Sequence, residues 1–303
     1  MTTPLAVAAY TGTYTTRTPY LTATEYQNAP TAVDATNLVQ GGTPQENAQE
    51  LLSVIGRASS IADDIVYGAQ GCLAATQDID GPTRYRIHRD GRIYFPCRFR
   101  PVLSVTSIKI GPTPSTMTAL TSAPDLVINP TGVLEIPFSG YYTIPGTIGI
   151  AGPLPNGQPL VQVTYINGYP NTNLATTTSA GATSIQVTSA VGLYAGTNLT
   201  IYDDYPGNEM VAVANSYTYG STTVPLTSAT LFTHSAGVSV SALPPSVKQA
   251  VVHLTSHLIK TRGTLSIEMP RLEGAPTHVN TMDGQDGDYE LAEYLLAPFK
   301  RTS

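Results

Sequence analysis

The sequence has 303 residues, of which 41% are hydrophobic and 12% are charged, against roughly 25% charged in typical soluble domains. This length predicts about two domains with enough apolar residues to bury a core. The net charge is −6, and none of the segments 1–42, 43–170, 171–243 and 244–303 is basic overall, which argues against a protein that holds duplex DNA by neutralising its phosphates. The low fraction of charged residues favours an obligate assembly whose neighbours cover much of the surface. An adhesive β-rich surface, or Thr and Ser in place of charged residues, would give the same low fraction.

The chain has two cysteines, Cys72 and Cys97, without the spacing of a zinc site, which predicts free, buried thiols in a reducing compartment. Its first residues lack the basic start and apolar stretch of a signal peptide. No run reaches the ~18 apolar residues that span a membrane. The sequence therefore predicts a soluble protein that is made in the cytoplasm.

Residues 1–42 are rich in threonine and without periodicity, which predicts an extended N-terminal arm. Within it, Thr22 and Glu25 have the spacing of a capping box and predict a short helix over residues 20–26. Alone, such an arm is expected to be disordered. Packed on a neighbouring subunit, it is expected to be ordered.

The first long helix is predicted to begin at Thr43, because Thr43 and Glu46 form a second capping box and Pro44 occupies the first helical position. Apolar residues then recur at three- and four-residue spacing up to Gly68 or Gly71, where the helix is expected to end. The members of this apolar stripe are Leu51, Leu52, Ile55, Ala58, Ala62, Ile65 and Val66.

Residues 83–100 contain Asp90-Gly91 between two alternating runs, which predicts a β-hairpin with a type I′ turn. This segment has six arginines against one aspartate, and we expect the arginines to form ion pairs across a subunit interface, since Arg suits bidentate carboxylate pairing. Contact with nucleic-acid phosphates and plain solvation are the alternatives. The arginines are Arg84, Arg86, Arg89, Arg92, Arg98 and Arg100. Further strands are predicted at residues 102–110, 125–129, 133–136 and 161–166.

Residues 171–243 contain no lysine or arginine and only three acids, Asp203, Asp204 and Glu209. This abrupt change of composition predicts a small inserted all-β domain, sandwich- or barrel-like. Its strands are expected near residues 184–187, 198–202, 209–214, 222–226 and 237–241. With so few charges, this domain is expected neither to bind nucleic acid nor to perform acid–base chemistry easily.

A helix is predicted over residues 244–263, followed by a loop over residues 270–287 and a short last helix over residues 288–298. The last helix is too short to persist undocked, so it must bind its own domain or a partner. The predicted fold class is α+β: a small helical bundle with β-hairpins or a short sheet over residues 43–170 and 244–303, with the β domain of residues 171–243 inserted.

No catalytic, metal or cofactor site is predicted. His253 and His257 have a spacing that can bind a metal, but Leu254 stands where a zinc protease needs glutamate, so a packed pair is favoured over a metal hydrolase. The run of Asp283, Asp286 and Asp288 looks calcium-like but lacks the spacing of an EF-hand loop.

With residues 171–243 removed, the order of elements is a capped helix, an arginine-rich hairpin, a Pro-Val-x-Ser-Val-Thr-Ser strand, a Val-Thr-Tyr-x-x-Gly-Tyr strand, a Pro-Pro-x-Val-Lys-x-Ala helix and a final Leu-Leu-Ala-Pro-Phe-Lys-Arg. This order resembles the head-to-tail connector (adaptor) proteins of long-tailed bacteriophages. The matching pieces are Thr83–Ile110, Val161–Pro170, Leu243–Gly263 and Glu290–Arg301. The long insert departs from the smaller members of that family.

The resemblance implies a homo-oligomeric ring, commonly a dodecamer, in the neck of the virion, assembled in the host cytoplasm. Its expected partners are the portal protein and a tail-side connector, stopper or tail protein, with DNA passing through the lumen without specific binding. The C-terminal segment is implied to face the portal. The implied portal-facing residues are Tyr289, Leu291, Tyr294, Leu295, Phe299 and Arg301.

Two other functions stay open. The first is a tail or surface protein whose β domain binds a host glycan through aromatic side chains, since the insert has five tyrosines but no tryptophan. These tyrosines are Tyr194, Tyr202, Tyr205, Tyr217 and Tyr219. The second is the metal hydrolase that would use His253 and His257.

Overall fold

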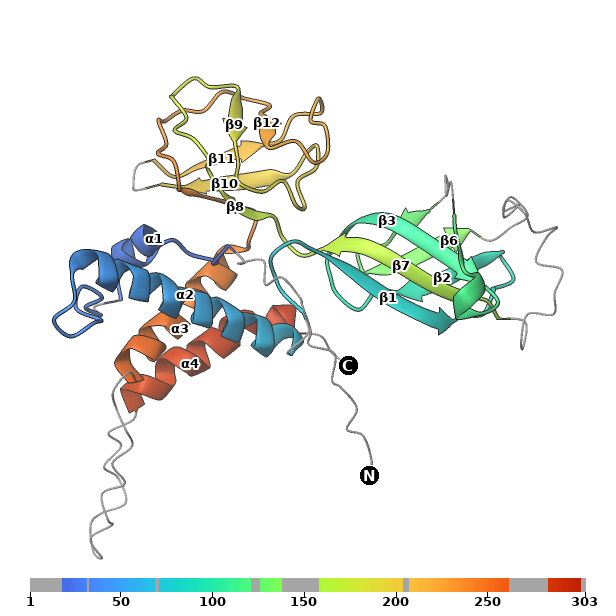
Figure 1. Cartoon of the computed structure of the whole chain (residues 1–303), viewed down its shortest axis with the longest axis horizontal. Helices are drawn as coiled ribbons and strands as arrows, with labels where there is room; N and C mark the ends of the chain where they lie inside the picture. Colours follow the sequence, from blue (N-terminus) through green and yellow to red (C-terminus); the bar gives the residue numbers. More distant parts are fainter. Residues whose placement is uncertain are drawn as a thin grey trace, which may run out of the picture.

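The computed structural model describes residues 18–31, 33–68, 71–120, 126–137, 158–203, 207–261 and 283–300. These residues form a mixed α+β fold with a few helices and several antiparallel sheets, so the predicted class is confirmed at this level. Figure 1 shows three groups of elements: the helices, a group of strands beside them and a second group of strands above them. Each group encloses its own cluster of buried apolar side chains. We call them the helical part, the first β part and the second β part.

The helical part is held together by apolar stripes that face one another. Its elements are α1 (Ala23–Asn28), α2 (Pro44–Tyr67), α3 (Pro245–Thr261), α4 (Asp283–Leu296) and the 3-10 turn η3 (Ala297–Phe299). Both predicted capping boxes are confirmed, at Thr22 with Glu25 and at Thr43 with Glu46, and an N-cap of this kind contributes about 1 kcal/mol. Helix α2 ends at Gly68, whose φ of 69° suits glycine at a helix end.

The expectation of an extended arm over residues 1–42 needs correction for the part from residue 18 onward. Tyr20, Leu21 and Tyr26 are buried in the core of the helical part. The Tyr20 hydroxyl donates to Asp63 Oδ1 at 2.5 Å and accepts from the Leu73 backbone N–H at 3.1 Å. Large side chains on a threonine-rich background therefore anchor this segment to its own chain. Residues 1–17 lie outside the described part.

The first β part consists of two antiparallel sheets that share one core. One sheet has the order β1-β7-β3-β4 and the other β2-β6-β5. The strands are β1 (Thr76–Arg84), β2 (Arg92–Pro96), β3 (Val102–Gly111), β4 (Thr118–Ala119), β5 (Val127–Ile128), β6 (Val133–Pro137) and β7 (Leu160–Asn167), with a 3-10 turn η1 (Pro114–Thr116) after β3. The predicted strands at 102–110, 133–136 and 161–166 are confirmed. The core of this part is separate from that of the helices.

The predicted hairpin over residues 83–100 is wrong as a pairing. The turn is present, with φ 74° at Gly91 and a hydrogen bond from the Gly91 N–H to the His88 carbonyl at 3.0 Å. However, β1 pairs with β7 and β2 pairs with β6. A local turn signal reports that the chain reverses but does not choose the partner strand. Strand β7 is buried along most of its length and offers β1 a more apolar neighbour than β2 does.

The second β part has a four-stranded sheet of order β11-β10-β13-β8 and a two-stranded sheet of β12 and β9. Its strands are β8 (Asn171–Asn173), β9 (Ser184–Gln186), β10 (Asn198–Tyr202), β11 (Glu209–Ala212), β12 (Thr223–Pro225) and β13 (Ser239–Ser241). All five predicted strands are present, and alternating side chains such as Leu199 and Ile201 face the core. The entry strand β8 pairs with the exit strand β13, so the two ends of this part lie side by side.

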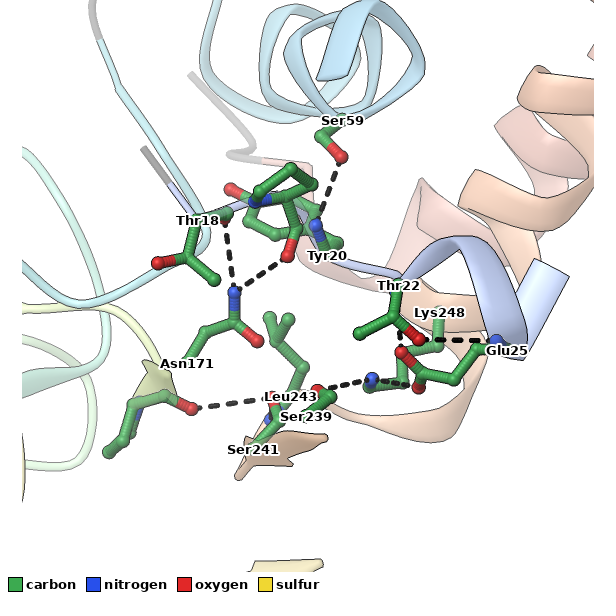
Figure 2. A network of polar contacts seen from close by, with 12 residues as sticks. Thr18, Tyr20, Thr22, Glu25, Ser59, Asn171, Ser239, Ser241, Leu243 and Lys248 are labelled. Atoms are coloured by element: carbon green, nitrogen blue, oxygen red, sulfur yellow. Dashed lines mark hydrogen bonds and ion pairs between the residues drawn. The ribbon is translucent and has the colours of Figure 1, made fainter. Parts of the chain in front are cut away.

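A buried ammonium group lies where the N-terminal segment, helix α3 and the second β part meet (Figure 2). Lys248 on α3 donates to Glu25 Oε1 at 2.5 Å and to Ser239 Oγ at 3.1 Å. Its Nζ lies 3.8 Å from the centre of the Tyr202 ring, a cation–π contact. Nearby, the Asn171 side-chain amide donates to the carbonyls of residues 18 and 19. Polar contacts therefore hold the second β part to the helical part.

The Lys248 side chain is only 6% exposed. Burial lowers its pKa, and the Glu25 carboxylate offsets part of that change. A charge in such a place is tolerated because each of its neighbours supplies a compensating contact.

We expect Lys248→Met to lower the free energy of unfolding by about 3–5 kcal/mol, because the substitution keeps the apolar stem but leaves the Glu25 carboxylate half-buried without its cation. Urea denaturation followed by circular dichroism measures the effect. The control is Lys300→Met, which removes an exposed ion pair with Glu293 and is expected to cost less than about 1 kcal/mol. Equal losses of unfolding free energy in the two variants would show that the buried ion pair contributes no more than the exposed one.

Candidate functional site

The six arginines of residues 84–100 lie in two places rather than on one hairpin face. Strand β1 runs away from the helices, so Arg84 and the turn that follows lie at the far end of the first β part (Figure 1). Residues 98–100 return toward the helices, where the Tyr67 hydroxyl of α2 donates to the Arg100 carbonyl at 2.5 Å. We call residues 84–94 the arginine tip.

Within the arginine tip, two of the four arginines are engaged. Arg92 forms an ion pair with Glu135 at 3.1 Å, and the Arg84 guanidinium donates to the carbonyl of Gln158 at 3.0 Å. Arg86 and Arg89 are exposed and, among the described residues, have neither a hydrogen-bond nor an ion-pair partner. Both residues line the same hollow, and free guanidinium groups are suited to a carboxylate or a phosphate.

The turn that presents these two arginines is fixed by Asp90. Its carboxylate accepts from the Tyr94 hydroxyl at 2.6 Å and from the Arg92 backbone N–H at 3.0 Å. The hydrogen bond from Tyr94, followed by that from Arg92, lowers the pKa of Asp90. Residues 86–90 together with Tyr94 line an open hollow at the end of the first β part. The tip is therefore a shaped cationic surface.

Helix α4 is docked on the helical part by one side and exposed on the other. Ala292 and Leu296 are fully buried in the core of the helical part. Leu291 is 41% exposed and Tyr294 is 76% exposed. Figure 1 shows α4 lying along α3.

The portal-facing candidates of the sequence therefore separate into three groups. Tyr289, Leu295 and Phe299 pack partly against the core of their own chain. Leu291 and Tyr294 face outward, and Arg301 lies outside the described residues. Only the outward pair is available to a partner among the described residues.

The contact between α3 and α4 includes a small ionic cluster around Asp288. Lys260 donates to Asp288 Oδ2 at 2.6 Å, and His253 Nδ1 lies 3.0 Å from Asp288 Oδ1. Burial alone would raise the pKa of Asp288, but the hydrogen bonds and charges of Lys260 and His253 outweigh it, so the pKa lies below its ordinary value. The cluster pins the start of α4 to α3.

The two histidines of α3 have different neighbours. Nε2 of His253 lies 3.0 Å from the Gln249 side-chain amide, so both of its ring nitrogens are engaged. The His257 ring lies 5.7 Å from the Tyr289 ring. Across the described residues, no group of three or more His, Cys, Asp or Glu side chains is placed to hold a metal ion. The side chains of Asp283 and Asp286 lie outside that description.

A buried cluster in the second β part was missed by the sequence reasoning. The His234 side chain is 0% exposed, with Nδ1 3.2 Å from Asp203 Oδ2 and Nε2 3.0 Å from Glu209 Oε1. Glu209 also accepts from the Leu231 backbone N–H at 2.7 Å. Both ring nitrogens can donate only if the ring is doubly protonated; a neutral ring needs a protonated carboxyl opposite. The only signal in the sequence is that two of the three acids of this segment, and a histidine, occur in a region otherwise almost free of charge.

The tyrosines proposed for glycan binding do not share one face. Tyr202 lies on Lys248 at the junction, and Tyr217 is buried. Tyr194 is hydrogen-bonded to Ser104 of β3 and stacks on Tyr219 with ring centres 4.9 Å apart. Tyr205 lies outside the described residues. The described tyrosines therefore serve mainly contacts within the chain.

Cys72 and Cys97 are free and buried, as expected from the sequence. Burial raises the pKa of Cys97 to about 12, so this thiol stays protonated at neutral pH. In the described part of the chain, no helix is both long and apolar enough to cross a membrane. The chain matches no protein-family model, no curated protein and no solved structure. The geometry of the described residues therefore carries the functional argument.

We expect His234→Leu to lower the free energy of unfolding by about 3 kcal/mol, because it leaves the buried Glu209 Oε1 without its contact to the imidazole ring. The double variant with Glu209→Leu should cost less than the sum of the two single substitutions. A double-mutant cycle measured by denaturation should give a coupling of at least about 1 kcal/mol. A coupling near zero would mean that the two side chains are neighbours without interacting.

We expect Asp288→Asn to weaken the docking of α4 by about 1 kcal/mol at neutral pH, because the amide cannot pair with the Lys260 ammonium as a charge. The pKa of Asp288 is depressed in the folded state, so its contribution is present above 3.8, its ordinary value, and is lost as the pH falls through the lower folded value. Hydrogen exchange of the α4 amides should show faster opening in the variant at neutral pH. The difference in stability from the wild type should vanish in acid, and a constant difference across that range would contradict the assignment.

Proposed function

We propose that this chain is a structural protein of a bacteriophage virion that forms a ring adaptor between the portal vertex and the tail. The observation that carries the proposal is that the molecule has two outward-facing contact surfaces at separate places. One is the arginine tip, with the unpaired Arg86 and Arg89. The other is the exposed side of α4, with Leu291 and Tyr294. A building block of a ring on a vertex needs such surfaces for its copies and for its neighbours.

The proposed architecture is a connector core of residues 43–170 and 244–303 with an inserted β domain over residues 171–243. Two observations support this. Residues 171–243 enclose a hydrophobic cluster of their own. Helices α2 and α3, which come before and after them in the chain, pack in one core. The chain enters this segment from β7 of the first β part and leaves it into α3, and the entry strand β8 pairs with the exit strand β13.

The proposed ring serves as a conduit for DNA rather than as a binding site for it. Each copy has a net charge of −6, and copies arranged around a lumen repel duplex phosphates. The proposed partners are the portal protein, a tail-side connector or stopper, and further copies of the chain, in the dodecamer that the resemblance implies. No enzyme activity, cofactor or membrane enters the proposal. The site of action is the neck of the virion after assembly in the host cytoplasm.

The glycan-binding alternative depends on an aromatic surface in the second β part. The stacked pair of Tyr194 and Tyr219, with Tyr219 48% exposed, is the feature that supports it. One stacked pair offers less than the shared aromatic face that the alternative requires. A glycan array with the full chain tests it directly.

Mass photometry of the purified chain, alone and with the portal protein of the same phage, tests the proposed function. Ring-sized species that bind the portal are expected. A chain that stays monomeric at micromolar concentration and does not bind the portal would contradict the proposal.

The portal contact is tested by Leu291→Ser/Tyr294→Ser, which we expect to weaken portal binding at least about tenfold, because it removes the two outward apolar side chains of α4. The fold should be unchanged, since neither side chain is buried. The matched control is Leu231→Ser in the second β part, where the side chain is 74% exposed and no effect on portal binding is expected. Surface plasmon resonance gives both affinities, and equal affinity for wild type and the α4 variant would exclude this surface.

A further inference from the structure

The charges of the molecule are segregated between the helical part and the first β part. Over described residues 71–120, 126–137 and 158–170 there are seven basic and four acidic residues, a balance of +3. Over described residues 18–31, 33–68, 244–261 and 287–300 there are four basic and nine acidic residues, a balance of −5. One chain therefore has a cationic end and an anionic end.

The geometry prevents these charges from neutralising one another within one copy. The arginine tip lies at the end of the first β part that points away from the helices (Figure 1). Arg86 and Arg89 accordingly have no partner among the described residues. Opposite charges that lie more than about 10 Å apart through solvent are largely screened at physiological salt. The two arginines are thus available to anionic groups that come from elsewhere.

The anionic end presents its carboxylates in a line along α2. Glu46, Glu50, Arg57 and Asp64 follow one another at spacings of four, seven and seven residues, which returns each to the same side of a helix. Glu50 pairs with Arg57 at 3.1 Å, whereas the Asp64 carboxylate has no partner among the described residues. Ser53 and Ser60, which lie on this same side of the helix, are exposed and small. We call these four charged residues the acidic line of α2, and it extends over roughly 27 Å at 1.5 Å per residue.

We propose that the arginine tip of one copy docks on the acidic line of α2 in the next copy, and that this contact closes the ring. The inference rests on the proposed function and names the two surfaces that join its subunits. Arg86 and Arg89 would each meet a carboxylate, the pairing for which the planar guanidinium is best suited. Because the two surfaces differ, the contact is head-to-tail, the type that generates rings when the rotation closes.

A carboxylate surface is favoured over DNA as the occupant. Free guanidinium groups bind phosphates as well as carboxylates, but each copy has a net charge of −6, so a ring of copies as a whole repels duplex phosphates. The carboxylates of α2 occur once in each copy, as the tip does. The numbers of donors and acceptors therefore match around a ring of any size.

Two charge-reversed variants test the contact. Arg86→Glu/Arg89→Glu changes the tip, and Glu50→Lys/Asp64→Lys changes the acidic line. Each alone is expected to stay monomeric at concentrations at which the wild type forms rings, with an apparent dissociation constant raised at least about 100-fold. An equimolar mixture of the two should assemble again, because each variant's intact surface matches the other's intact surface and the two reversed surfaces match each other.

The matched control is Lys109→Glu/Lys300→Glu, which makes the same change of net charge at two exposed cations outside the tip and outside the acidic line. It should assemble as the wild type does. Normal assembly of the tip variant, or failure of the mixture to assemble while each variant keeps its fold by circular dichroism, would overturn the inference. A tip variant that assembles normally but loses salt-dependent binding of DNA would assign the tip to DNA instead. A wild type that forms no ring, with or without portal, would overturn the proposed function itself, so the two failures are distinct.

Discussion

The arrangement of the molecule depends on one buried cation. The Lys248 ammonium is stable in its place only because Glu25, Ser239 and the Tyr202 ring surround it. These groups come from the N-terminal segment and from two strands of the second β part. Removing a charge from water is costly, and the cost is offset only when all partners are in position at once. The contact therefore selects a single placement of three segments rather than merely adding stability.

That placement explains how the chain presents its outward surfaces. The N-terminal segment covers α2 and α3 with Tyr20 and Tyr26, so the helices have a complete core without help from a neighbour. Helix α4 closes the same core with Ala292 and Leu296, which leaves its opposite side free. Because a complete core already fixes this surface, binding a partner does not require the conformational entropy of ordering it.

Features set by neighbouring residues could be predicted from the sequence. The capping boxes at Thr22 and Thr43 and the strand of residues 198–202 depend on contacts within a few positions. Pairings over long distances could not be predicted: Lys248 lies 223 positions from Glu25, and β1 joins β7 instead of β2. The cluster around His234 could not be predicted either, because its members occur in separate loops and strands. For the candidate site, the sequence supplied the arginines and the apolar residues of α4. Only the fold shows which of them are free.

The pairing of β8 with β13 has a consequence for how such a chain can change over time. Because the segment is entered and left at adjacent strands, a longer, shorter or unrelated module can be spliced in at this seam without displacing α2 or α3. The constraint on any replacement is chemical: it must still bring a hydroxyl and an aromatic ring to the lysine at the base of α3. The length and sequence of the module at this seam can thus change, but a module that cannot stabilise the Lys248 charge is not tolerated.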